Sequence, residues 1–121
     1  MATDKLPNSG EILTAHYTAA DIANSLDADE WRSAQPVKID RYWSGDAAPV
    51  TRHAEARILW SDHALHVRYV CNQAEPLVIS DHPQTITKTM YLWDRDVCEI
   101  FLAPDPSAIE KYFEFEVAPT G

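Results

Sequence analysis

Two stretches near the middle of the chain alternate between hydrophobic and polar residues in a way that predicts a pair of β-strands. Residues 55–61 (EARILWS) and residues 64–72 (ALHVRYVCN) are separated by a turn at Asp62-His63. Successive side chains of a strand point to opposite faces, so each stretch has one apolar face and one face that carries its charged residues. Such alternation is typical of half-buried antiparallel strands.

A second pair of strands is predicted nearer the C-terminus. Residues 91–104 (YLWDRDVCEIFLAP) lead from an aromatic loop into a strand at 97–102, and residues 112–118 (YFEFEVA) form the last strand. Glu99 lies in the middle of its strand, on a face shared with Val97 and Phe101. A carboxylate in that position is uncommon unless something pairs with it.

The remaining elements are short. The sequence predicts strands at 11–17 and 37–41, a brief pairing at 77–79, and short helical turns around 21–26 and 107–111, after a polar lead-in at 1–10. Loops rich in Pro, Gly and Asp separate these elements. The pattern predicts an all-β fold, an antiparallel β-sandwich with at most one or two short helical turns, in a single domain spanning 1–121.

Composition and charge narrow the partners. The chain has 121 residues, 45% of them hydrophobic, which is enough for a packed core. Its net charge of −9, with ten scattered basic residues, disfavours nucleic acid or an anionic membrane as partner. We find no signal segment and no run of about 18 apolar residues. Cys71 and Cys98 fall in different strand patterns, which favours two buried free thiols over a disulfide.

The charged faces of the predicted strands allow two interpretations. They are either a cross-strand charge ladder on a solvated face or the floor of a cleft for a hydroxyl-rich ligand, and spacing alone favours the ladder. The residues concerned are Arg57, His66, Arg68, Glu99, Glu114 and Glu116.

Trp93 is a second candidate. An indole beside Asp94 and Asp96 can stack on the C–H face of a sugar while carboxylates accept hydrogen bonds from its hydroxyls. A tryptophan at the end of a β-sandwich core would fit the sequence equally well.

Other chemistry has weaker support. Asp81, Asp94, Asp96 and Glu99 are oxygen donors suited to calcium, yet they match no complete calcium loop, and the histidines show no zinc spacing. No catalytic motif is present, and Glu99 with Glu114 or Glu116 would be the one pair open to glycosidase chemistry. The sequence therefore predicts no enzyme and assigns no metal ligands.

The motifs together resemble a known family. ARILWSDHALHVRYVCN, LWDRDVCEIFLAP and YFEFEVAPTG, preceded by DADEW before VKI, are similar to the family 9 carbohydrate-binding modules and their relatives among the DOMON-like sandwiches. The resemblance runs from about residue 28 onward.

The resemblance implies a jelly-roll-like β-sandwich that binds saccharides without catalysis, typically at chain ends of plant polysaccharides, in carbohydrate catabolism. It implies that Trp93 stacks on the sugar and that Glu99 accepts hydroxyl hydrogen bonds, and we add Arg57 and Arg68 as donors. It also implies structural calcium, with ligands not placed on this sequence, and an extracellular or periplasmic location.

The sequence departs from the family pattern at its end. Family members continue for several strands that carry a second sugar-clamping tryptophan, whereas this sequence stops at Gly121. We expect either a fragment or a homodimer formed through open strand edges. A self-associating domain with core tryptophans, or a haem-binding relative in the same sandwich group, are the alternative functions.

Overall fold

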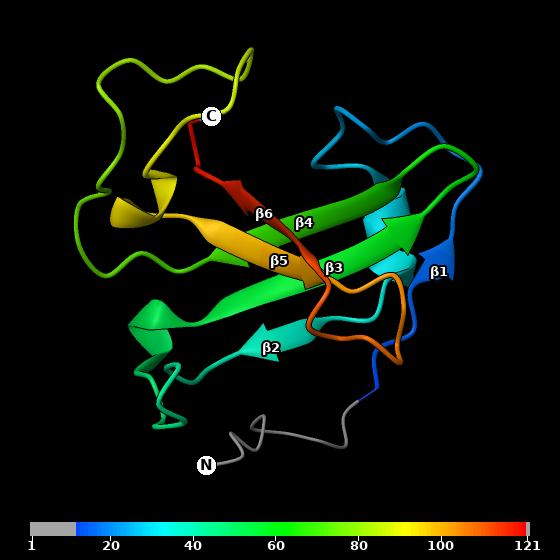
Figure 1. Ribbon diagram of the computed structural model, residues 1–121, viewed down its shortest axis with the longest axis horizontal. Coiled ribbons are helices and arrows are strands. Elements are labelled where there is room, and N and C mark those ends of the chain that lie inside the picture. Colours follow the sequence, from blue (N-terminus) through cyan, green and yellow to red (C-terminus); the bar gives the residue numbers. More distant parts are fainter. Residues whose placement is uncertain (1–11, 121) are drawn as a thin grey trace. The chain divides into compact units, whose positions relative to one another are not determined.

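The computed structural model describes residues 12–120 (Figure 1). The chain divides into two compact units, Met1–Ala74 (unit 1) and Glu75–Gly121 (unit 2). The predicted lead-in at 1–10 and the first residue of the strand predicted at 11–17 lie outside the described residues.

The sheet of unit 1 is built around its longest central strand, β3 (Ala54–Trp60). The strand β4 (Leu65–Cys71) pairs with β3 along its whole length and is antiparallel to it. The strand β2 (Val37–Ile39) is antiparallel to the first half of β3, and β1 (His16–Tyr17) is parallel to its end. The two longest predicted strands of this unit are confirmed within one residue at each end.

The register of β3 and β4 puts the charged residues of unit 1 on one face. Arg57 lies opposite Arg68, and Leu59 lies opposite His66. Residues directly opposite each other share a face of the sheet. Arg57, His66 and Arg68 therefore lie on the same face, as the alternation predicts.

The same face also carries the core of unit 1. The 3-10 helix η1 (Asp29–Ser33) supplies Trp31, which is 3% exposed and packs with Ile22, Ala34 and the fully buried Leu59. The face that carries the charged residues is therefore not solvated along its whole length, because η1 and its flanks cover Leu59. The helical turn predicted around 21–26 is also misplaced, since helical structure begins at Asp29.

Unit 2 contains a two-stranded antiparallel sheet of β5 (Cys98–Leu102) and β6 (Phe113–Val117). The 3-10 helix η3 (Leu92–Asp94) precedes β5. The segment predicted to pair at 77–79 forms no strand, but its Val78 N–H donates to the Asp96 carboxylate (2.8 Å) and its C=O accepts the Asp96 N–H (2.9 Å). The turn predicted as helical at 107–111 is not a helix either.

The described residues thus form an all-β fold, with their strands in two sheets and their helical residues confined to 3-10 segments, which include η2 (Val50–Arg52). The predicted fold class is confirmed. Cys71 is exposed, so the prediction that both cysteines are buried is wrong for that residue. No helix between residues 12 and 120 combines the length and hydrophobicity needed to span a bilayer.

Candidate functional site

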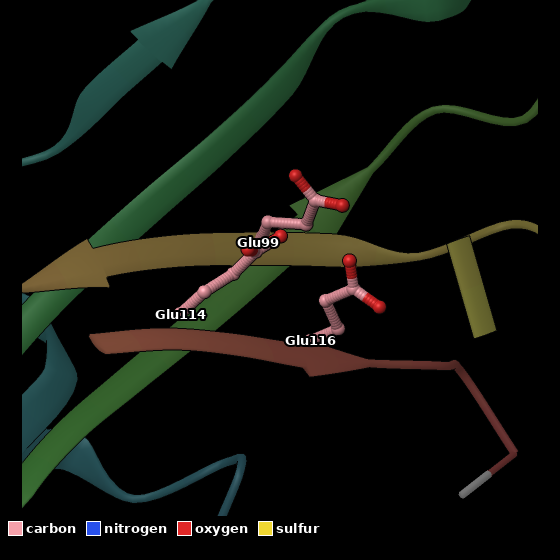
Figure 2. Close-up of side chains that lie close together, drawn as sticks. All are labelled: Glu99, Glu114 and Glu116. Carbon is pink, nitrogen blue, oxygen red and sulfur yellow. The ribbon is translucent and has the colours of Figure 1, made fainter. Parts of the chain in front are cut away.

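Three glutamates gather on one face of the β5–β6 hairpin. Glu99 lies directly opposite Glu116, and Glu114 is two residues before Glu116, on the same face of β6. One carboxylate oxygen from each side chain lies within 4.8 Å of the others, and Figure 2 shows the three side chains close together at the hairpin. The sequence predicts this grouping because both strands alternate and pair in a single antiparallel register.

Crowding in this cluster changes the protonation of Glu116. Burial of its half-buried side chain raises the pKa of Glu116 from 4.5 to about 7, and the hydrogen bonds and charges of Glu99 and Glu114 add to the rise. Near neutral pH, Glu116 therefore retains a proton for a substantial part of the time. A neutral carboxyl group can donate a hydrogen bond as well as accept one.

The Glu116→Gln variant should lose a pH dependence of stability that the natural chain shows. Between pH 4.5 and about 7 the folded chain holds a proton on Glu116 that the unfolded chain has released. The contribution of Glu116 to the free energy of unfolding is therefore largest below pH 4.5 and falls as the pH rises toward 7. Glutamine stays neutral, so the variant should match the natural chain in acid and exceed its stability above pH 7.

Urea unfolding, followed by circular dichroism at pH values from 4 to 8, measures this difference. Glu110→Gln removes a carboxylate outside the cluster and should leave the shape of the profile unchanged. If the free energy of unfolding changed with pH in the same way in the natural chain and in Glu116→Gln, the expected protonation of Glu116 would be contradicted.

Trp93 lies in η3, shortly before β5 begins. The preceding Leu92 is buried and anchors the segment, whereas the Trp93 side chain is 52% exposed and meets Tyr91 edge to face at 5.4 Å. Tyr91 has φ 59°, the only positive φ of a non-glycine residue between residues 12 and 120. A bulky residue in the left-handed region is strained, and such strain tends to occur at functional sites. Trp93 is therefore a surface indole and not a core residue.

A cleft in unit 2 brings Trp93 and the carboxylates together. It has a volume of about 450 Å³ and is lined by Lys88, Thr89, Leu92, Trp93, Glu114, Phe115 and Glu116. Glu99 does not line the cleft, but a carboxylate oxygen of Glu99 lies within 4.8 Å of those of Glu114 and Glu116, which do. The cleft thus combines a flat aromatic surface with carboxylates, a cation and a hydroxyl.

Gln84 organises the loop that forms one wall of this cleft. The side-chain NH₂ group of Gln84 donates to the Thr87 backbone carbonyl (3.1 Å) and to the Thr89 hydroxyl (3.2 Å). Its side-chain oxygen accepts hydrogen bonds from the backbone N–H groups of Ile86 and Thr87. Lys88 and Thr89 did not stand out in the sequence, because an irregular loop has no periodicity. The glutamine followed by closely spaced threonines is the only local signal.

Arg57 and Arg68 hold the core of unit 1 together. The Arg57 guanidinium donates to the carbonyls of Trp31 (3.0 Å) and Ala34 (3.1 Å) and pairs with Glu55 at 2.6 Å. Arg68 donates to the Leu26 carbonyl (3.0 Å), and its guanidinium carbon lies 5.2 Å from the centre of the Trp31 ring. Both arginines thus fasten the segment around η1 to the sheet.

The carboxylates considered for calcium are not gathered as a set. Asp96 accepts the Val78 N–H group, which is the role of a loop-fixing aspartate. Among the described residues, the one group of at least three acidic, His or Cys side chains close enough to share an ion is Glu99, Glu114 and Glu116. Carboxylates suit calcium, but calcium takes six to eight oxygen ligands, and exposed acidic clusters are common without an ion. No metal ligand is assigned.

Comparison with known proteins agrees with the resemblance seen in the sequence. Residues 23–118 match the family described as carbohydrate family 9 binding domain-like. No curated protein and no solved structure shows significant similarity to the chain. Because the family match covers most of the 121 residues, the chain belongs to the carbohydrate family 9 binding domain-like family.

Proposed function

We propose that the cleft of unit 2 binds the end of a saccharide chain of the plant-polysaccharide type, without catalysis. The observation that carries this proposal is the half-exposed Trp93 indole lining one cleft with Glu114 and Glu116. Membership of a carbohydrate-binding family supports the ligand class.

The lining supplies both kinds of contact that a pyranose needs. The apolar C–H face of the sugar stacks on the Trp93 ring, and its hydroxyls donate to the carboxylates of the cluster. Lys88 and Thr89 can donate hydrogen bonds to the ring and hydroxyl oxygens. Glu116, with its raised pKa, accepts or donates as the orientation of the sugar requires.

The position of the glutamates favours binding over hydrolysis. In a glycosidase, two carboxyl groups flank the scissile bond, and they act from different sides of the sugar. Glu99 and Glu116 are neighbours on the same face of one hairpin, so both approach a bound sugar from the same side. We therefore propose that Glu116 accepts hydrogen bonds from the sugar, that Glu99 acts through its neighbours Glu114 and Glu116, and that none of them is catalytic.

The proposed site leaves out Arg57 and Arg68. Their guanidinium groups donate to backbone carbonyls of unit 1, and removing such a donor would leave those carbonyls unsatisfied. We propose that both arginines are structural.

Calorimetric titration of the full chain with cellobiose, xylobiose and their hexaoses tests this proposal. If the chain end is recognised, the disaccharide and hexaose of one series should have similar affinities per mole of chain. An affinity that grows in proportion to chain length would instead indicate recognition of internal sugars. Absence of heat and of any tryptophan fluorescence change with every sugar would refute saccharide binding.

A further inference from the structure

A tight turn in unit 1 is held by several backbone hydrogen bonds. Gly45 N–H donates to the Tyr42 carbonyl (2.8 Å), and Tyr42 N–H donates to the Asp46 carbonyl (2.9 Å). Arg41 and Ala47 form an isolated antiparallel bridge at its base, and the Arg41 guanidinium donates to the Gly45 carbonyl (3.0 Å). Gly45 has φ 90°, a left-handed conformation that glycine adopts at little cost. The turn is therefore preorganised.

This turn displays an indole almost entirely to solvent. Trp43 lies at its tip and is 97% exposed, the highest value among the large exposed hydrophobic residues of the described chain. A tryptophan offers about 150–250 Å² of surface for burial, so this ring contributes little to folding but much to any contact that covers it. Because the backbone beneath it is already fixed, covering the ring costs little additional conformational entropy.

Tyr42, which is 43% exposed, precedes Trp43, and the residues that follow Trp43 in the turn are small or polar. Ser44 donates from its hydroxyl to the Asp46 carboxylate (3.0 Å), and Gly45 has no side chain. A protein contact would usually need a contiguous apolar patch, whereas both residues adjacent to Trp43, Tyr42 and Ser44, carry hydroxyl groups. Nucleic acid and anionic membranes are disfavoured by the net charge of −9.

We propose that Trp43 is a second saccharide-binding platform, on which the C–H face of a pyranose stacks while Ser44 and Asp46 contact its hydroxyls. The inference rests on the saccharide class proposed for unit 2, but it concerns a different surface, within unit 1. It gives the chain two aromatic contacts for sugar, one in each unit.

Nuclear magnetic resonance of the ¹⁵N-labelled full chain tests this directly, because each of the four tryptophans contributes one indole N–H signal. Single Trp→Phe variants assign the signals, and cellohexaose and xylohexaose are the probes. The Trp43 signal should shift as the hexaose concentration rises and then reach a plateau, both in the natural chain and in Trp93→Ala. The Trp31 signal should stay in place, since its N–H group is bonded to the Ser25 carbonyl (3.0 Å) in the core.

The outcomes separate this inference from the proposed function. A shift of the Trp93 signal without Trp43 overturns the second platform and leaves the cleft of unit 2 in place. A shift of Trp43 alone supports the platform and overturns the cleft, and no shift of either signal overturns both. Broadening of Trp43 with protein concentration and no response to sugar would identify a self-contact and overturn the platform.

Affinities complete the test. In the Trp93→Ala chain, adding Trp43→Ala should weaken the remaining hexaose binding by about tenfold or more, as expected when a central aromatic contact is lost. Adding Val50→Ala instead removes another exposed apolar side chain of unit 1, 68% exposed, and should leave affinity unchanged. Equal affinities for these two double variants would overturn the platform.

Discussion

Replacing Trp31 with alanine should lower the free energy of unfolding by about 3–5 kcal/mol, as is typical for truncating a buried tryptophan. The side chain is 3% exposed and packs with Ile22, Ala34 and Leu59. The variant would also lose the indole hydrogen bond to the Ser25 carbonyl and the surface beneath the Arg68 guanidinium. Urea unfolding of the full chain, followed by circular dichroism, measures the loss.

Trp31→Phe is the matched control. Phenylalanine keeps an aromatic ring in the core but cannot donate to Ser25, so we expect a smaller loss of about 1–3 kcal/mol from the unsatisfied carbonyl and the lost volume. If the free energy of unfolding of Trp31→Ala is within about 1 kcal/mol of that of the natural chain, the arrangement of this core around η1 is wrong.

The strands of both sheets were predictable because each is amphipathic. In β3, β4, β5 and β6, side chains alternate between apolar and charged residues, and the two strands of each antiparallel pair follow each other in the chain, joined by a tight turn in the first pair and by a longer loop in the second. Alternation fixes which residues share a face, and antiparallel pairing then fixes which charges meet. The grouping of Glu99 with Glu114 and Glu116 follows from these two facts. The segment at 77–79 forms no strand, and Asp96 instead bonds the N–H and C=O groups of its central residue, Val78.

The tryptophans show where sequence reasoning stops. Trp31 is buried, Trp60 and Trp93 are 45% and 52% exposed, and Trp43 is 97% exposed. Three of them lie in or beside loops or 3-10 segments, where no periodicity reports which side chain faces the core. Burial is decided there by contacts with residues distant in sequence, such as the packing of Trp31 on Leu59. For this reason the sequence alone left Trp93 equally suited to the core and to the surface.

The arginines illustrate a related limit. Alternation correctly puts Arg57 and Arg68 on one face of the sheet, opposite each other. It does not reveal that η1 and its flanks cover this face, so that carbonyls of residues more than 20 positions away accept their N–H groups. A charged side chain on a strand face therefore looks the same in sequence whether it binds a ligand or a covering loop.

Replacing Trp93 with alanine should weaken binding of cellobiose and xylobiose by about 30-fold or more, the effect of losing a central aromatic contact worth roughly 2 kcal/mol. The ring is half exposed and lines the cleft, so its removal takes away the stacking surface without opening a core. Glu114→Gln should weaken binding by about tenfold, because Glu114 lines the cleft and a hydrogen bond to a charged acceptor contributes about 1.5 kcal/mol. Calorimetric titration of the full-chain variants measures both losses.

Trp60→Ala is the matched control, since Trp60 is 45% exposed and meets Tyr17 edge to face at 4.8 Å, much as Trp93 meets Tyr91. Both variants lose a half-exposed indole and an aromatic pair, but only Trp93 lines the carboxylate cleft. Trp60→Ala should therefore keep the natural affinity for both disaccharides. Equal losses in the two variants would mean that exposed indole surface, and not the cleft beside Glu114 and Glu116, accounts for the binding.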